Sequence, residues 1–178
     1  INGVYWGTYD LAEDQADDFG SSYFGGAKAD YDVIDQGVLK SGTWAAYSAM
    51  KSLPGWTGGS PTTDRTTAPT GATYNTPFTN AQYEQLRGLL DVPWFIDYMV
   101  LHWFTGHRDW ATESNYNKNW YVVRPKDGKF MFLPWDQGNL LWHEQENRVS
   151  GMTTVAAGGT PSLYPPAAIH PRVKANAE

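Results

Sequence analysis

The fold is decided by residues 119–136, which read NWYVVRPKDGKFMFLPWD. Two runs of mainly β-branched and aromatic residues, 120–123 and 130–133, flank a Pro-Lys-Asp-Gly turn sequence, in which proline presets φ and glycine tolerates a positive φ. This pattern predicts an antiparallel β-hairpin. Because the first strand of a hairpin begins at the end where the second strand finishes, the pattern also places Asn119 and Asp136 close together.

Asp136 is the strongest single candidate for chemistry in this stretch. It follows an apolar strand and a Pro-Trp pair, where an ionised carboxylate needs a cation, a charged partner or backbone donors. Upstream, residues 107–109 form a His-Arg-Asp triplet similar to that of the protein-kinase catalytic loop, although Ser114 stands where that motif has asparagine. Taken alone, Asp109 is more typical of a cap or turn residue after a helix than of a catalyst.

The first third of the chain is predicted to contain two strands and two short helices. Residues 1–11 alternate in the manner of a strand and include an Asn-Gly hairpin signal. An acidic cluster precedes a helix over 19–24, where it suits the positive end of the helix dipole. Residues 31–34 are predicted to form a strand, and the aromatic spacing over 42–53 predicts a packed helix.

Two further helices are predicted after a long loop over 54–78, which is rich in Gly, Pro, Thr and Ser. A capping-box pattern begins the helix over 79–90, and an Asp followed by a Pro begins the helix over 91–106. Within the second helix, His102 is predicted to be a hydrogen-bonded, at least partly buried histidine. The stripe predicted to face the core contains Phe95, Met99 and Trp103, with Ile96 and Val100 beside it.

Composition limits the classes of function. With 178 residues, 41% hydrophobic and 15% aromatic, the chain has the size and character of one globular domain. A net charge of -6 and 13 scattered Lys and Arg residues argue against a nucleic-acid partner. The absence of cysteine excludes disulfides and thiolate metal sites. The longest apolar run, 94–104, is shorter than the ~20 residues that a transmembrane helix needs.

Several motifs together resemble the kinase-like domains of the spore-coat protein H (CotH) family. In the first half of the chain these motifs are NGVYWG at 2–7, YDLAE at 9–13, YFGG at 23–26 and DYDVI at 30–34. In the second half they are LDV at 90–92, FIDYM at 95–99, Gly106 with DW at 109–110, NWY at 119–121, DGKF at 127–130 and PWD at 134–136. The resemblance follows the chain in order except over the predicted loop.

The resemblance implies an α+β fold of the atypical protein kinase type, with helices packed around a small antiparallel sheet. Residues 1–178 would form a single partial domain that corresponds to the C-lobe of a kinase. In this reading the N-terminal part of the domain is missing, residues 54–78 are a loop insertion and residues 143–171 are irregular. The lack of an initiator Met and the strand-like start agree with a fragment of a longer protein.

The implied activity is transfer of phosphate from ATP to Ser or Thr residues of surface or spore-coat proteins, with Mg²⁺ or another divalent cation. By the same resemblance, Asp109 would orient or deprotonate the acceptor hydroxyl, while Asn119 and Asp136 would hold the metal that bridges the phosphates. Glu13 matches an acidic position after the opening strand and is assigned to the nucleotide. The residues themselves do not indicate a location, and the resemblance implies a place outside the cell, at the cell surface or in the bacterial spore coat.

Two departures from the family pattern affect the metal ligands. The gap between the Asp-Trp and Asn-Trp-Tyr motifs is longer here than is usual in the family, so Asn115 or Asn117 is an alternative to Asn119. Many relatives also carry a second acidic residue two positions after the Trp-Asp pair, where this chain has Gly138.

A second class of function stays open from the sequence. The chain would then be a catalytically silent surface module of the same fold that binds protein or carbohydrate through exposed Trp and Tyr side chains. The basic residue that contacts the phosphates in the family would lie before Ile1, so the isolated chain is expected to be inactive even if the complete protein is a kinase.

Overall fold

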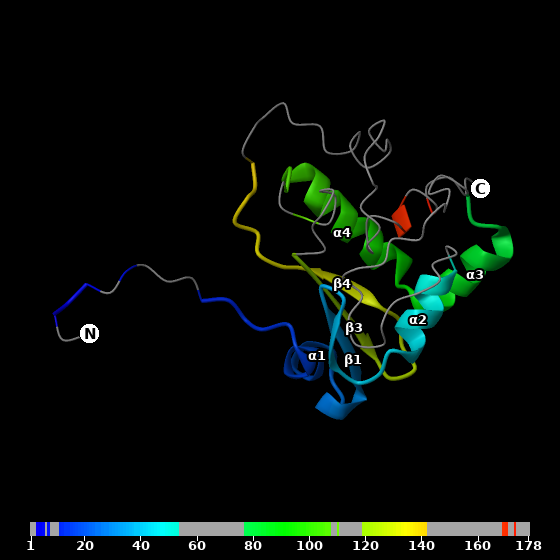
Figure 1. Cartoon of the computed structure of the whole chain (residues 1–178), viewed down its shortest axis with the longest axis horizontal. Coiled ribbons are helices and arrows are strands. Elements are labelled where there is room, and N and C mark those ends of the chain that lie inside the picture. The colour runs from blue at the N-terminus through cyan, green and yellow to red at the C-terminus, as the bar shows by residue number, and fades with distance from the viewer. Residues whose placement is uncertain are drawn as a thin grey trace.

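The computed structural model describes residues 3–5, 7, 11–53, 77–107, 110, 119–141, 169–170 and 173. Within these residues the protein is α+β, with four α-helices and a four-stranded antiparallel sheet in the order β2-β1-β3-β4 (Figure 1). The elements are α1 Asp17–Phe24, the 3-10 helix η1 Lys28–Asp30, β1 Tyr31–Asp35, β2 Val38–Ser41, α2 Ala45–Ser52, α3 Asn80–Leu89, α4 Val92–Phe104, β3 Trp120–Pro125 and β4 Met131–Pro134. The predicted α+β class is confirmed.

The predicted hairpin is formed by β3 and β4. The two strands pair antiparallel, with Trp120 opposite Pro134 at the end away from the turn. The positive φ of the turn falls on Asp127, at 60°, and not on the glycine that follows it. Gly128 is needed for space instead, because a Cβ there would lie 2.5 Å from Cγ of Pro125. The turn is therefore where the sequence predicts it, but the positive φ expected at its glycine occurs at Asp127 instead.

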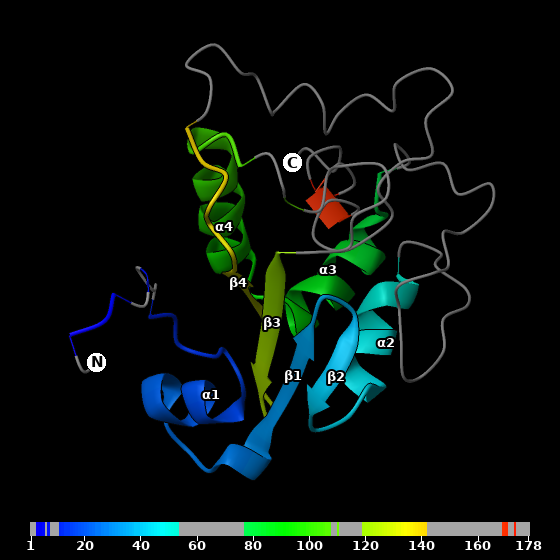
Figure 2. The ribbon, with the colours of Figure 1, turned by 60° about the vertical axis from the view of Figure 1, so that its left-hand side comes forward.

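The central strand β3 is buried on both of its faces along residues 120–123, which explains why it is apolar at consecutive positions. Trp120 and Val122 belong to a large core cluster, and Tyr121 and Val123 belong to a smaller one. The large cluster also contains buried residues of α2, α3 and α4, while Phe19 of α1 packs against the small cluster. Figure 2 shows the strands standing between α1 and the helices α2 and α3. The helices thus pack around the sheet as predicted.

Helices α3 and α4 begin with the caps that their sequences indicate. The backbone N–H of Gln82 donates to Oγ1 of Thr79 at 3.2 Å, and the backbone N–H of Thr79 donates to Oε1 of Gln82 at 3.0 Å. Asp91 caps α4 by accepting from the backbone N–H of Trp94 at 3.1 Å. The N–H of Asp91 also donates to the carbonyl of Phe130 at 3.0 Å. The junction between the two helices is therefore fixed to the hairpin.

The core-facing side of α4 differs from the prediction. Ile96 and Val100 are about half exposed, at 53% and 51%, so their assignment to the core side is wrong. Trp103 is only partly buried against the large cluster. The fully buried residues of the helix are Phe95, Tyr98, Met99 and His102. Apolar residues occur on almost every side of this helix, so the hydrophobic period alone does not select one face.

The predictions for the first third of the chain have mixed outcomes. No strand forms among the described residues of the 1–11 segment, where Tyr5 is 82% exposed. The helix predicted over 42–53 is α2, and the strand over 31–34 is β1. The edge strand β2 was not predicted.

Most of the predicted loop, residues 54–76, lies outside the described residues. Of the region predicted to be irregular, 143–171, only residues 169 and 170 are described, and both are helical.

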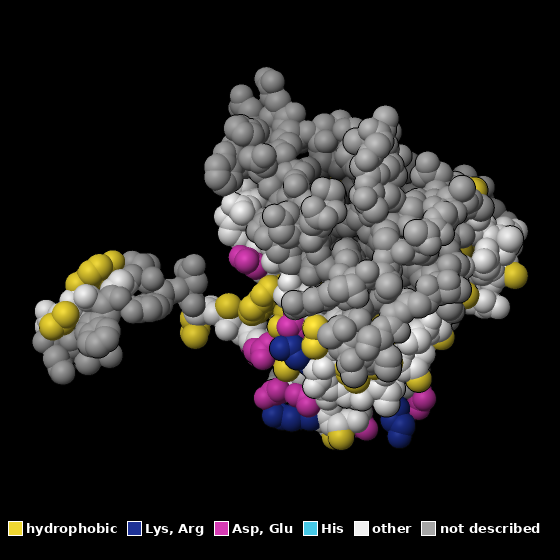
Figure 3. Space-filling view, viewed as in Figure 1, with side chains coloured by type: hydrophobic (Ala, Val, Ile, Leu, Met, Phe, Trp, Pro, Cys, Tyr) yellow, Lys and Arg dark blue, Asp and Glu magenta, His cyan; other side chains and the backbone are white. Residues whose placement is uncertain are grey.

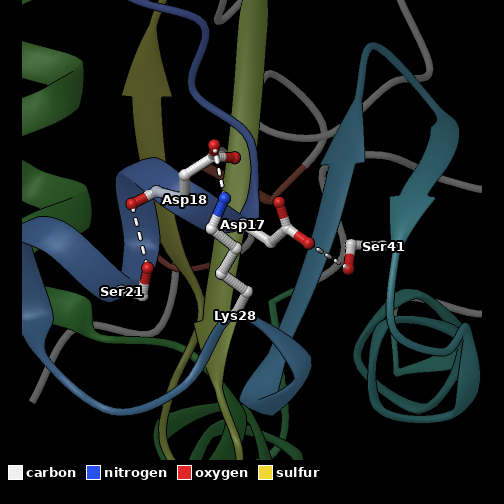
Figure 4. Close-up of polar contacts among 5 residues, drawn as sticks. All are labelled: Asp17, Asp18, Ser21, Lys28 and Ser41. Atoms are coloured by element: carbon white, nitrogen blue, oxygen red, sulfur yellow. Dashed lines mark hydrogen bonds and ion pairs between the residues drawn. The ribbon is translucent and has the colours of Figure 1, made fainter.

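The acidic start of α1 is confirmed, and polar contacts fix this helix to its neighbours (Figure 4). The Asp18 carboxylate forms an ion pair with Nζ of Lys28 at 2.7 Å, and Asp17 accepts a hydrogen bond from Oγ of Ser41 at 3.2 Å. The main-chain carbonyl of Asp18 also accepts a hydrogen bond from Oγ of Ser21 at 3.1 Å. The helix is thereby held to η1 and to the edge of the sheet.

Four basic side chains of the described residues have acidic neighbours. The ion pairs are Lys28–Asp18, Lys40–Asp35, Arg87–Glu84 and Arg124–Asp32, with distances between 2.7 and 3.1 Å. Figure 3 shows acidic and basic groups lying next to one another on one face of the molecule. These four cations are thus locally neutralised and do not form a joint phosphate-binding surface. None of the described helices is both long and apolar enough to cross a lipid bilayer.

Candidate functional site

The open end of the hairpin carries two of the predicted site residues. Asn119 directly precedes the Trp120–Pro134 pair on one strand, and Asp136 follows it by two positions on the other. Both have left-handed backbones, with φ of 66° and 47°. Asn119 is buried, at 4% exposure, whereas Asp136 is exposed. The strand register places them at the same end of the hairpin, which is the arrangement that the sequence predicted.

Asp109 and the alternative ligand Asn117 lie outside the described residues. The nearest described residues before and after Asp109 are His107 and Trp110, and both are buried. His107 is buried at 1% exposure and Trp110 at 2%. The indole N–H of Trp110 donates to the hydroxyl of Tyr98 at 2.6 Å, and its ring stacks on His102 with centroids 4.2 Å apart. Residues 107 and 110 are therefore anchored in the core on both sides of the candidate catalytic residue.

The anchor at residue 107 is a pair of buried histidines. Nδ1 of His102 lies 3.0 Å from Nδ1 of His107, which also lies 3.3 Å from Nε2 of Gln137. An amide nitrogen can only donate, so Nδ1 of His107 accepts and Nδ1 of His102 carries a proton. Burial, followed by repulsion from His107, lowers the pKa of His102 to about 3. The predicted hydrogen-bonded core histidine is confirmed, and it is neutral at physiological pH.

The same contact joins two loops of the candidate site. Gln137 directly follows Asp136, and His107 stands two positions before Asp109. A second bond between these loops runs from the backbone N–H of Leu141 to the carbonyl of Thr105, at 2.7 Å. The segment after β4 accordingly runs beside the C-terminal end of α4 (Figure 2). The loop that carries Asp136 and the segment that leads to Asp109 therefore lie side by side.

Glu13 lies on a segment that is held to the end of β4. Two residues after it, Gln15 donates from Nε2 to the carbonyl of Pro134 at 2.9 Å. Glu13 itself is exposed and accepts a hydrogen bond from the hydroxyl of Tyr23 at 2.8 Å. This bond raises the pKa of Tyr23. The structure thus brings the segment of Glu13 to the same end of the hairpin as Asn119 and Asp136.

The donor set at this end is suited to a hard cation that is only partly held by protein. Within the described residues, Asp136 makes no hydrogen bond or ion pair, and no group of three or more His, Cys, Asp or Glu residues could hold a metal ion. One carboxylate and one amide oxygen, from Asp136 and Asn119, are hard ligands of the kind that Mg²⁺ prefers. Mg²⁺ sites that rely on one or two protein ligands are completed by substrate phosphates and water.

The family of the chain follows from comparison with known sequences. The sequence model described as CotH kinase protein matches residues 1–164 of the 178. The chain belongs to the CotH kinase family. No curated protein and no solved structure matches it. The family that the sequence motifs resembled is therefore confirmed over most of the chain.

Sequence reasoning missed the side chains that hold the site of this CotH chain together. Gln15 stands two positions after Glu13 and Gln137 directly follows Asp136, and each bonds to a residue far away in the sequence, Pro134 and His107 respectively. Glutamine in a short polar stretch has no local pattern that reveals a distant partner. In the sequence, His107 stands out only as part of the His-Arg-Asp triplet, and its pairing with His102 depends on tertiary packing.

Proposed function

We propose that this CotH chain is part of an atypical, kinase-like protein that transfers phosphate from ATP to Ser or Thr hydroxyls of surface or spore-coat proteins. Mg²⁺ or another divalent cation would accompany the nucleotide. Membership of the CotH kinase family supports a kinase-like function. The arrangement of the loops at the open end of the hairpin supports the assignment of roles to particular residues.

The observation that carries the proposal is the contact between Gln137 and His107, at 3.3 Å. It brings the loop of Asp136 next to the chain that leads to Asp109. Protein kinases need two acidic residues on neighbouring loops, one for the metal and one for the acceptor hydroxyl. The contact supports the proposal that a metal-side residue and an acceptor-side residue stand on neighbouring loops here.

Asp136 is assigned to the metal side for reasons of charge and access. Its carboxylate is exposed and makes no hydrogen bond or ion pair in the described part of the chain. Asn119, at the same end of the hairpin, supplies an amide oxygen. When bound, the cation would neutralise charge on the phosphates. Glu13, on the segment that is held to β4, is assigned to the nucleotide.

Asp109 is assigned to the acceptor side. The acceptor oxygen forms a bond to the γ-phosphorus, the bond from that phosphorus to the bridging oxygen of ADP breaks, and the hydroxyl proton passes to the Asp109 carboxylate. His107 and Trp110, which precede and follow this residue in the chain, are both buried, and this supports a fixed attachment of the acceptor-side segment to the core. Positioning of this kind supplies much of the rate enhancement in phosphoryl transfer.

The acceptor role predicts a specific kinetic defect. In the full-length protein, Asp109→Asn should lower the rate of phosphotransfer to a Ser-rich acceptor by about 10²-fold or more, because a proton acceptor is lost. Affinity for Mg-ATP should stay within about twofold of the parent value, since Asp109 does not contact the nucleotide. Radiolabel transfer and calorimetry would measure the two quantities.

Asp127→Asn is the matched control, because this exposed residue lies in the turn at the far end of the same hairpin. It should change neither quantity. Parent-like phosphotransfer by Asp109→Asn would show that the acceptor role is wrong.

A further inference from the structure

The turn between β1 and β2 contains a residue that its backbone conformation does not favour. Asp35 pairs with Val38, so the turn consists of Gln36 and Gly37 alone. Both have positive φ, 48° and 82°, as a type I′ turn requires. Asn, Asp and Gly usually occupy the first of these positions, and a left-handed conformation costs other residues ~1 kcal/mol. The presence of glutamine at position 36 therefore needs a reason other than the conformational preference of the turn.

That side chain reaches the start of β3. Oε1 of Gln36 accepts a hydrogen bond from the backbone N–H of Asn119 at 3.1 Å, and the backbone N–H of Gln36 donates to the carbonyl of Trp120 at 3.1 Å. Regular pairing of β1 with β3 ends at Asp35 and Tyr121. Gln36 thus extends the ladder past the point where β1 turns away, with its side-chain oxygen in place of a backbone carbonyl.

The orientation of this amide is fixed from both sides. Nε2 of Gln36 donates to Oδ1 of Asp35 at 2.8 Å, and Asp35 in turn forms an ion pair with Nζ of Lys40 at 3.1 Å. A carboxylate can only accept and a backbone N–H can only donate, so the nitrogen faces Asp35 and the oxygen faces Asn119. The Gln36 amide is therefore held with its acceptor directed at the main chain of the candidate metal ligand.

Asn119, whose backbone N–H bonds to Gln36, has a left-handed backbone conformation. Asn119 is 4% exposed and has a φ of 66°, a conformation that directs its side chain differently from that of a regular strand residue. Trp120, which is fully buried, fixes the chain on the other side. Without the Gln36 oxygen, the N–H of Asn119 would lose this partner at a buried position, which is unfavourable.

We propose that Gln36 is a positioning residue for the metal side of the site, which fixes the main chain of Asn119, the proposed amide ligand of the cation. This inference rests on the proposed role of Asn119 as a ligand. Residues that orient metal ligands from outside the coordination shell affect metal affinity by about 10- to 100-fold. Loss of Gln36 should therefore raise the Mg²⁺ requirement of nucleotide binding.

Two substitutions separate the hydrogen bond from the backbone of the turn. Gln36→Gly removes the side chain and relieves the left-handed backbone, and Gln36→Met keeps the length of the side chain without the amide. Asp127→Gly is the control, because it makes the same kind of backbone change at an exposed residue of another turn, where φ is 60°. Asp136→Asn reports on the proposed metal site itself.

The first readout needs neither metal nor nucleotide. In the metal-free, full-length protein, hydrogen exchange at the Asn119 amide should be slow in the parent and in Asp127→Gly, and faster by at least about tenfold in both Gln36 variants. Unchanged protection of that amide in Gln36→Met would overturn the inference, because the bond would not hold Asn119.

The second readout is the Mg²⁺ concentration for half-maximal ATP binding. It should rise about tenfold in both Gln36 variants, with ATP affinity restored at saturating Mg²⁺. A uniform loss of affinity at every Mg²⁺ concentration would overturn the inference, since it would indicate general structural damage. Parent-like Mg²⁺ dependence in both Gln36 variants, with loss of binding in Asp136→Asn, would overturn the role of Gln36 alone. Absence of Mg²⁺-dependent ATP binding in the parent itself would overturn the proposed function together with this inference.

Discussion

At the scale of single residues, the buried histidine pair has the clearest physical consequence. His102 is 1% exposed, and its ring stacks on Trp110 while Nδ1 faces His107. A charged imidazole has no place in this packing, which is why the pKa of His102 falls to about 3 from an ordinary 6.5. The neutral pair links α4 to the loop of Asp136 through Gln137.

Stability should therefore fall in acid. Between pH 6.5 and about 3 the unfolded chain binds a proton at His102 that the folded chain does not. The free energy of unfolding then decreases as the pH falls, by up to about 1.4 kcal/mol per pH unit from this group. Urea denaturation at several pH values would measure the slope. His102→Phe keeps the stacked ring without titration and should give a shallower slope, and equal slopes would contradict the assignment.

The residues that form the site were only partly predictable. Asn119 and Asp136 follow from the hairpin, because strand pairing depends on a local pattern of apolar runs and a turn. Gln36, Gln137 and His107 were not predictable as a unit, since their contacts join parts of the chain that are distant in sequence. A polar side chain shows its partner only after the fold has brought the two together.

At the scale of elements, glycines inside helices give a matched test of packing. A Cβ on Gly20 of α1 would lie 2.6 Å from the ring of Tyr31, which is buried. A Cβ on Gly88 of α3 would have no heavy atom within 4 Å. The two positions are both helical, so alanine has the same intrinsic advantage of at most about 1 kcal/mol at each.

Gly88→Ala should therefore stabilise the protein by about 0.5 to 1 kcal/mol, while Gly20→Ala should destabilise it by about 1 to 2 kcal/mol through overpacking against Tyr31. Chemical denaturation of the two variants beside the parent would measure both values. Stabilisation by Gly20→Ala would mean that α1 does not pack on the sheet at this position.

Element prediction succeeded where the signal is local and failed where burial decides. The Thr79 capping box and the Asp91 cap are set by residues three positions apart, so they are readable in the sequence. The core side of α4 is not, because Ile96 and Val100 are as apolar as the residues that are buried. The short edge strand β2, Val38–Ser41, has no clear alternation and depends on its pairing with β1.

At the scale of the whole molecule, the hairpin organises the candidate site. Its open end collects Asn119 and Asp136, the segment of Glu13 is bonded to Pro134, and Gln137 joins the chain that leads toward residue 109. Four segments that are far apart in the sequence thus meet at one end of the sheet. Membership of the CotH kinase family, over residues 1–164, supports the proposal that these segments form a site for phosphate transfer.

The central claim is that Asp136 holds the cation that accompanies ATP. Calorimetric titration of the full-length protein with Mg-ATP tests it most directly, with the parent, Asp136→Asn and Asp109→Asn compared under the same conditions. Asp136→Asn removes the charge and keeps the shape of an exposed side chain, so it should weaken binding more than about tenfold without lowering thermal stability. Asp109→Asn should bind like the parent. Parent-like binding of Mg-ATP by Asp136→Asn would contradict the account.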